Sequence, residues 1–227
     1  MPEKVILDRL EIEADVEGVL RYLGYPASSE AATRIRERVE EAIRAARGAL
    51  RPRGTYSLYP VISTSPDSLT LEGNVTFRGE IGEFLGQANR AAVFVGTAGP
   101  EIVAMAEAAL SKRDIVGGMA FDALGSWLAE AAVEKIVEDL SGRLQPGESL
   151  TLCFSPGYCG VSLAQQRLIF RLVDAAAVGV ELLPTLIMKP VKSVSGLIGI
   201  GPAQAVKAYG NPCDRCPELD CKMRRAG

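Results

Sequence analysis

The sequence predicts an α+β fold, in which a central antiparallel β-sheet is flanked by helices. The first observation is that strand-like and helix-like stretches are segregated along the chain and do not alternate strictly, as a doubly wound parallel sheet requires. The second is that turn-forming segments separate successive strand-like stretches. The third is size, because 227 residues, 48% of them hydrophobic, suffice for a substantial core. We expect one domain over residues 1–227, with 202–227 as a cysteine-containing C-terminal tail.

Two helices are expected near the start of the chain. The first covers residues 17–25, with its preceding turn. The second covers residues 28–50, where Ser29 is a candidate N-cap and apolar residues recur at helical spacing from Ile35 to Ala46. Helices therefore precede the sheet.

The next stretches change to strand-forming composition. Residues 56–63 (YSLYPVIS) and 68–79 (SLTLEGNVTFRG) are rich in Val, Thr and Tyr, and the turn-forming TSPD lies between them. This pattern predicts an antiparallel pair of strands. A short helix is expected at 81–89.

Residues 91–110 predict a buried strand, a tight glycine turn and a helix. The three-glycine spacing of a dinucleotide-binding loop is missing there. The longest helix follows over about 114–140, and small residues along it permit close approach of another element: Gly117, Gly118, Ala123, Gly125 and Ala129.

A turn-rich connection at 141–148 leads into the last third of the chain. There the sequence predicts a strand at 149–157, an amphipathic helix at 162–175, and two strands around a Pro190 corner within 180–201. These strands would complete the antiparallel sheet.

Composition excludes several classes of function. The net charge of −3 and a pI near 5.3 oppose electrostatic binding to nucleic acid or anionic lipid. No apolar stretch approaches the roughly 20 residues that span a bilayer, and the acidic start resembles no signal peptide, so we expect a cytoplasmic protein. Without histidine, the chain cannot build a Ser-His-Asp or Cys-His site, so we do not expect catalysis by this chain alone.

The cysteines point to a metal or redox site. Cys213, Cys216 and Cys221 form a C-x2-C-x4-C pattern whose thiolates can converge on one metal ion. A fourth ligand would come from Cys159 or Cys153, since no histidine is present. An all-cysteine site accepts an iron–sulfur cluster or zinc, and free thiols or a redox disulfide remain alternatives.

The segment SPGY at 155–158 is a candidate ligand turn. Pro156 fixes its own φ, and Gly157 permits backbone conformations that a side chain would hinder, so backbone groups could face a ligand. Tyr158 offers a flat ring for stacking and a hydroxyl for hydrogen bonding. The alternative is a turn without a ligand.

The long helix carries a polar stripe at intervals of four residues, formed by Asp122, Ser126, Glu130 and Glu134. Such a stripe commonly faces solvent. Glu130 is surrounded by small and apolar residues, so its carboxylate could instead meet a cationic ligand.

Three segments together resemble the activation domain of vitamin B12-dependent methionine synthase. They are FDALGSWLAEAAVEKIVEDL, FSPGYCGVSLAQQRLIFRLV and GVELLPTLIMKPVKSVSGLIGIG, and they occur in the family's order. The resemblance covers about 115–200 and is most specific at the PGY turn and at the corner from Pro190 to Gly196.

The resemblance implies a purpose as well as a fold. Such a domain binds S-adenosylmethionine and docks over the cob(II)alamin of a partner corrinoid methyltransferase, where one-electron reduction and methyl transfer restore methylcobalamin. By position, Glu130 matches a family carboxylate that meets the ligand, and Ser155, Pro156, Gly157 and Tyr158 match the turn that cradles it. The chain would thus reactivate a methionine synthase core or a similar enzyme.

The sequence departs from the family in three places. Cys153 stands where the family pattern R-x-x-P-G-Y has arginine, no aromatic segment is recognisable after Gly201, and the cysteine tail belongs to no such activation domain. The tail suggests two sources for the electron: a cluster in the chain itself, or a separate flavodoxin or ferredoxin.

Two other functions fit fewer of these features. One is a noncatalytic subunit of a split methionine synthase that shields the corrinoid and carries a structural metal. The other is a conventional S-adenosylmethionine methyltransferase, which the missing glycine-rich fingerprint disfavours.

Overall fold

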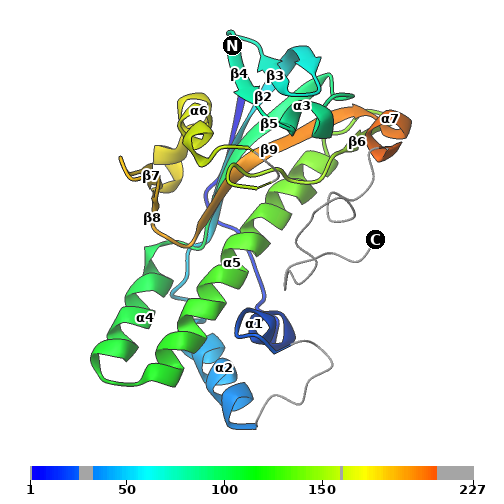
Figure 1. Cartoon of the computed structure of the whole chain (residues 1–227). Coiled ribbons are helices and arrows are strands. Elements are labelled where there is room, and N and C mark those ends of the chain that lie inside the picture. The colour runs from blue at the N-terminus through cyan, green and yellow to red at the C-terminus, as the bar shows by residue number, and fades with distance from the viewer. Residues whose placement is uncertain (1, 26–32, 159–160, 209–227) are drawn as a thin grey trace.

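A computed structural model describes residues 2–25, 33–158 and 161–208 (Figure 1). Its main feature is a seven-stranded antiparallel sheet in the order β4-β3-β2-β5-β9-β6, with β1 also pairing with β2. The predicted α+β fold is confirmed. The strands are β1 (Glu3–Leu7), β2 (Arg53–Ser65), β3 (Ser68–Leu71), β4 (Val75–Arg78), β5 (Arg90–Thr97), β6 (Glu148–Leu150) and β9 (Ser193–Pro202).

The long strand β2 bends the sheet. Its first part pairs with β1 on one edge and β5 on the other, and its last part pairs with β3. The register shifts between Val61 and Ser63, and such an irregularity increases local twist. The predicted strand 68–79 is in fact two strands, β3 and β4, because Gly73 and Asn74 turn the chain with positive φ angles of 85° and 60°.

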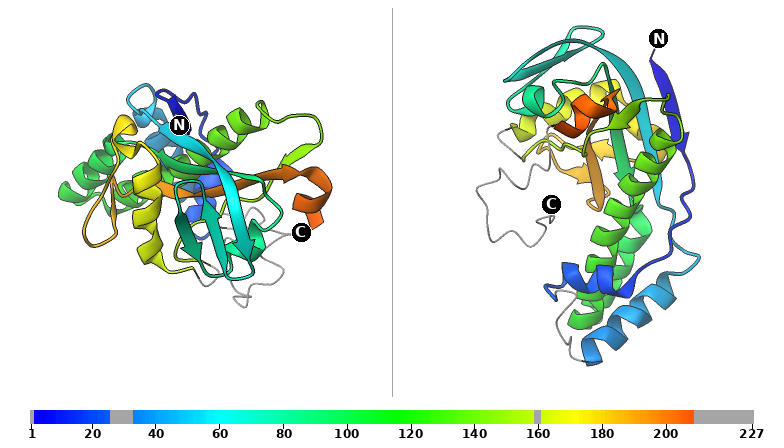
Figure 2. Two further views of the ribbon diagram at one scale, coloured as in Figure 1. Left: turned by 90° about the horizontal axis from the view of Figure 1, so that it is seen from above. Right: turned by 90° about the vertical axis from the view of Figure 1, so that its right-hand side faces the viewer.

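The helix α5 (Ile115–Ser141) covers one face of the sheet (Figures 1 and 2). Alternate residues of β5 decide which face is which. Phe94 packs with Val133 and Ile136 of α5, whereas Val93 and Val95 belong to the cluster on the other face. The predicted helix at 114–140 is confirmed, and Asp114 caps it by accepting a hydrogen bond from the Gly117 N–H at 3.0 Å.

Short elements cover the opposite face: α3 (Ile81–Phe84), η1 (Leu163–Gln165), α6 (Gln166–Leu172) and η2 (Ala175–Val178). The rings of Phe84 and Phe154 lie 4.7 Å apart within this cluster. The predicted helix 162–175 is shorter than expected. It ends at Leu172, since Val173 is extended and the Asp174 carboxylate caps the next turn through the Ala177 N–H.

A helical layer extends beyond the sheet. α1 (Val16–Tyr22), α2 (Thr33–Ala46) and α4 (Pro100–Ser111) pack on the first half of α5 around a separate buried cluster that includes Val19, Val39 and Leu124. The second predicted helix, 28–50, ends earlier than expected, at Ala46. Its predicted cap, Ser29, lies outside the described residues.

The last part of the chain turns at Pro190 as predicted. A hairpin of β7 (Glu181–Leu182) and β8 (Met188–Lys189) precedes a cis peptide bond between Lys189 and Pro190, after which β9 begins. The Ser193 hydroxyl donates to the Pro190 carbonyl at 2.7 Å and closes this corner. α7 (Ala203–Ala208) follows β9.

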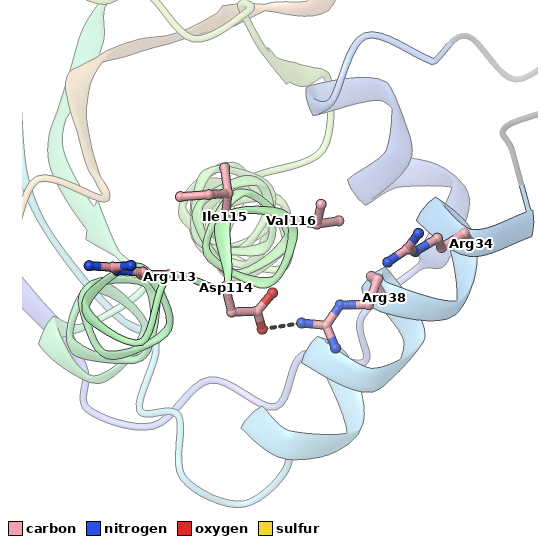
Figure 3. Close-up of a pocket in the computed structure, with 6 residues that line it drawn as sticks. All are labelled: Arg34, Arg38, Arg113, Asp114, Ile115 and Val116. Carbon is pink, nitrogen blue, oxygen red and sulfur yellow. Dashed lines mark hydrogen bonds and ion pairs between the residues drawn. The ribbon is translucent and has the colours of Figure 1, made fainter.

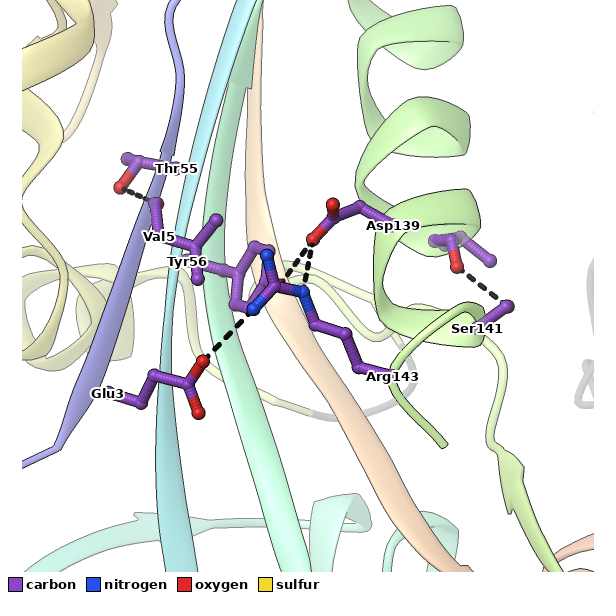
Figure 4. Close-up of polar contacts among 8 residues, drawn as sticks. Glu3, Val5, Thr55, Tyr56, Asp139, Ser141 and Arg143 are labelled. Atoms are coloured by element: carbon purple, nitrogen blue, oxygen red, sulfur yellow. Dashed lines mark hydrogen bonds and ion pairs between the residues drawn. The ribbon is translucent and has the colours of Figure 1, made fainter. Parts of the chain in front are cut away.

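A polar network joins β1 and β2 to the end of α5 (Figure 4). The buried Tyr56 hydroxyl donates to Asp139 at 2.5 Å, and Arg143 pairs with Asp139 and with Glu3 of β1. Burial, followed by the hydrogen bond to Asp139, raises the pKa of Tyr56. The phenol therefore stays protonated and serves as a hydrogen-bond donor.

No helix in the described part of the chain is long and apolar enough to cross a membrane.

Candidate functional site

The PGY turn leaves the sheet at the edge of β9. Phe154 and Leu197 exchange two backbone hydrogen bonds, both 2.8 Å long, so residues 151–154 extend the sheet past β6. This segment was predicted as part of one strand at 149–157, but the structure contains β6 followed by a single bridge.

A close approach of two backbones allows this bridge. A methyl group at Gly196 would lie 2.4 Å from the Phe154 carbonyl oxygen and 2.9 Å from the Phe94 ring. Only glycine therefore fits at this position of β9. This requirement explains the last residue of the SVSG corner.

The turn itself is held by backbone geometry. Gly157 has a φ of 96°, which a side chain disfavours, and its N–H donates to the Val161 carbonyl at 2.8 Å. The Val161 N–H donates in return to the Tyr158 carbonyl at 3.0 Å. Tyr158 is 71% exposed, so its ring is available to a ligand or to a partner protein.

Beside this turn, the edge of β9 is open. Because Leu197 directs its N–H and C=O toward Phe154, Ser195, two residues away, directs its own groups toward the same edge. In the register of the bridge, the residue alongside Ser195 is Pro156, which has no N–H to donate. Within the described residues, no hydrogen bond joins Ser195 to the turn. The backbone donor and acceptor of Ser195 thus have no described partner on this edge, and Ser195 itself is buried, with 4% of its surface exposed.

The predicted carboxylate Glu130 lies on α5, close to the sheet. It is partly buried and precedes Val133 by one turn, and Val133 packs in the same cluster as Cys153 and Val194. Glu130 therefore lies one turn from a residue of the cluster that also contains Cys153, two residues before Ser155. Ser155 and Pro156 are partly and fully buried, respectively.

The first two residues of the polar stripe, Asp122 and Ser126, contact a lysine of the same chain. The Lys192 ammonium pairs with Asp122 at 2.7 Å and donates to the Ser126 hydroxyl at 2.9 Å. A methyl group at Gly125 would lie 2.9 Å from the Lys192 side chain, so the small residue makes room for it. The stripe is therefore a contact between α5 and the residue that precedes β9 here, whereas Glu134 faces solvent.

The predicted metal ligands Cys159, Cys213, Cys216 and Cys221 all lie outside the described residues. Among the residues that the structure does describe, no group of three Cys, Asp or Glu side chains is placed to hold a metal ion. Cys153, the alternative fourth ligand, is partly buried and packs in the cluster beneath α5.

Sequence reasoning missed the open edge at Ser195 and the contact of Lys192 with α5. The SVSG motif carried the signal, since small residues within a strand mark a close approach of backbone or ligand. The motif alone does not say which edge of the strand is free.

By sequence, the chain matches no protein-family model and no curated protein. A comparison of structures finds the crystal structure of the MetH reactivation domain bound to AdoHcy, which is S-adenosylhomocysteine. The two chains align with a TM-score of 0.63 over 87% of this chain and 81% of that one, at 19% sequence identity. The chain has the fold of the MetH reactivation domain.

This likeness confirms the resemblance predicted from the sequence, at the level of the fold. The reactivation-domain fold explains why the PGY turn, the SVSG corner and the long helix occur in one order: the turn and the corner are paired through Phe154 and Leu197, and α5 packs across both. The three segments that carry the resemblance thus meet at one place in this reactivation-domain fold.

Proposed function

We propose that the chain binds S-adenosylmethionine, and its demethylated product S-adenosylhomocysteine, at the open edge of β9, and that it reactivates a corrinoid methyltransferase. The observation that carries the proposal is the shared fold with a domain whose crystal structure holds S-adenosylhomocysteine. A second support is the edge of β9 beside the PGY turn, where the backbone groups of Ser195 make no hydrogen bond to any residue that the structure describes.

The residues at this edge suit the chemistry of the ligand. The backbone N–H and C=O of Ser195 can pair with polar edges of a nucleoside or amino acid, and the exposed ring of Tyr158 can stack on a flat base. A carboxylate such as Glu130 favours the positive charge of the ligand's ammonium or sulfonium group. S-adenosylmethionine bound there supplies a methyl group to the reduced corrinoid of the partner.

In the proposed reaction, cob(II)alamin on the partner gains one electron and becomes cob(I)alamin. Cob(I)alamin attacks the methyl carbon, so a cobalt–carbon bond forms as the carbon–sulfur bond breaks and S-adenosylhomocysteine leaves. A flavodoxin, a ferredoxin or a cluster bound by Cys213, Cys216, Cys221 and Cys159 supplies the electron.

Binding of S-adenosylhomocysteine by isothermal titration calorimetry tests the first half of the proposal. We expect saturable binding that Tyr158→Ala and Glu130→Gln each weaken about tenfold, or roughly 1.4 kcal/mol. Glu134→Gln is the matched control, because it removes an exposed carboxylate one turn further along α5, and it should leave the affinity unchanged.

Equal loss of affinity in Glu134→Gln and Glu130→Gln would contradict the assigned ligand site.

The second half of the proposal, reactivation, is tested with a corrinoid methyltransferase. The visible spectrum follows the recovery of methylcobalamin from cob(II)alamin. Tight association with the corrinoid protein that does not depend on S-adenosylmethionine would instead favour the noncatalytic subunit.

A further inference from the structure

A second surface lies where the α4–α5 turn meets the start of α2, and the proposed ligand site does not use it. The surface holds a pocket of about 500 Å³, shown in Figure 3. In the whole-chain view, this corner lies at the end of α5 remote from α3 and α7 (Figure 1). The pocket is lined by Arg34, Arg38, Arg113, Asp114, Ile115 and Val116.

The pocket carries positive charge that no described side chain around it neutralises. Arg38 pairs with Asp114 and Glu41, so its charge is balanced. The side chains of Arg34 and Arg113, in contrast, make no hydrogen bond or ion pair with any described residue. The corner is therefore basic on a chain whose net charge is −3.

The backbone conformation at Arg113 does not favour an arginine. Arg113 has a φ of 63°, a conformation that favours glycine after the end of a helix, and its N–H donates to the Leu110 carbonyl at 2.9 Å. A residue with a side chain is less stable than glycine in this conformation, and no hydrogen bond or ion pair of the Arg113 side chain with a described residue offsets that cost. A contact with another molecule would account for it.

Exposed large apolar side chains lie in this pocket, at Ile115 and Val116, and on neighbouring turns of α4 and α5, at Leu110 and Met119. Ile115, Met119 and Leu110 are 57%, 54% and 46% exposed, and Val116 is 37% exposed. They form one patch, because Leu110 of α4 lies against Gly118 of α5, where a methyl group would come within 2.5 Å of it. Grouped exposed apolar residues with a charged rim mark an interaction surface.

We propose that this basic apolar corner, formed by Arg34, Arg113, Leu110, Ile115, Val116 and Met119, docks an acidic segment of a partner protein. Carboxylates of the segment would pair with Arg34 and Arg113, and its apolar side chains would cover Ile115 and Met119. Charge complementarity favours this partner, because the two guanidinium groups, which have no ion-pair partner in the described part of the chain, flank the apolar patch.

Other occupants fit the corner less well. A small anion would satisfy the arginines but would leave the four apolar side chains exposed. A second copy packed face to face about a two-fold axis would bring Arg34 and Arg113 against the same residues of its neighbour, and like charges at an interface are costly. An acidic segment with apolar side chains satisfies both parts of the surface.

A fluorescein-labelled peptide of alternating Glu and Leu residues is a direct probe, used with the full chain in fluorescence anisotropy. We expect saturable binding that weakens at least tenfold in the double variant Arg34→Ala/Arg113→Ala and several-fold in Ile115→Ser/Met119→Ser. Arg47→Ala is the matched control, since Arg47 is an exposed arginine just beyond the other end of α2, and it should change the affinity less than twofold. A thermal melt checks that each variant is folded.

Three results would overturn the proposal. The first is no binding of the peptide, or binding that all variants share. The second is displacement of the peptide by millimolar inorganic phosphate together with equal binding of poly-glutamate, which would make the corner a small-anion site. The third is a dimer in size-exclusion chromatography that Arg34→Ala/Arg113→Ala dissociates, which would identify a second copy as the occupant.

Discussion

At the scale of single residues, the candidate site depends on two glycines. Gly196 lets the Phe154 carbonyl approach β9, and Gly157 supplies the positive φ that starts the turn. Tyr158 follows Gly157 in this turn and is 71% exposed. The side chain that we propose as a ligand contact is thus preceded by a residue without a side chain.

The substitution Gly196→Ala tests this positioning. The added methyl meets backbone at 2.4 Å, so residues 151–154 must move away from β9. We expect unfolding by urea to show a loss of about 1–3 kcal/mol, and calorimetry to show weaker binding of S-adenosylhomocysteine.

Gly142→Ala is the matched control for this substitution. Its φ is −67°, and the added methyl would make only an ordinary contact, 3.5 Å from the Asp139 carbonyl oxygen. It should be neutral or slightly stabilising. Equal destabilisation by the two substitutions would contradict the steric role of Gly196.

At the scale of elements, the short strand β6 is anchored by one carboxylate. Glu148 accepts hydrogen bonds from the Gln145 N–H at 2.9 Å and from the Arg90 guanidinium of β5 at 2.7 and 2.8 Å. The backbone hydrogen bond first, and then Arg90, lower the pKa of Glu148 below its usual value of 4.5. The ionised carboxylate therefore holds the start of the segment that leads to the PGY turn.

This anchor predicts a pH dependence of stability. Because the folded pKa of Glu148 is the lower one, its stabilisation is present above about pH 4.5 and is lost as the pH falls through the folded pKa. We expect Glu148→Gln to lower Tm at pH 7 and to flatten the fall of Tm between about pH 5 and 3.

Thermal melts across this range, with the exposed Glu134→Gln as control, measure the effect. Parallel curves for the wild type and Glu148→Gln would show that Glu148 does not contribute to the acid sensitivity.

The boundaries of helices and strands show which features the sequence predicts well and which it does not. The long helix was predicted almost to the residue, because its cap Asp114 and its long run of helix-forming residues are local signals. The pair β3 and β4 was predicted as one stretch, although the local turn signal Gly73-Asn74 lies within it. The helix 162–175 was overextended because Asp174 caps a new turn and competes with the helix.

At the scale of the whole molecule, the cysteine tail decides whether the chain carries its own redox centre. We propose that Cys213, Cys216, Cys221 and Cys159 bind an iron–sulfur cluster, with zinc as the alternative. Anaerobic purification should then yield a protein with a broad absorption band near ~400 nm, stoichiometric iron and sulfide, and bleaching by reductant.

Substitution of one ligand provides the control for this experiment. Cys216→Ser should remove both the band and the metal, whereas Cys153→Ser should preserve them if Cys159 is the fourth ligand. A colourless wild-type protein that contains zinc would assign the metal a structural role, and one without metal would leave the electron to an external donor.

The sequence by itself determined the fold class, the order of the main elements and the likeness to an activation domain, because periodicity, caps and glycine positions are local properties of the chain. Only the tertiary structure decided which edge of β9 lacks a partner among the described residues, that Lys192 pairs with Asp122, and that Arg34 and Arg113 flank one apolar corner. Each of these features joins residues that are distant in sequence, and their proximity depends on strand order and helix packing, which no local pattern encodes.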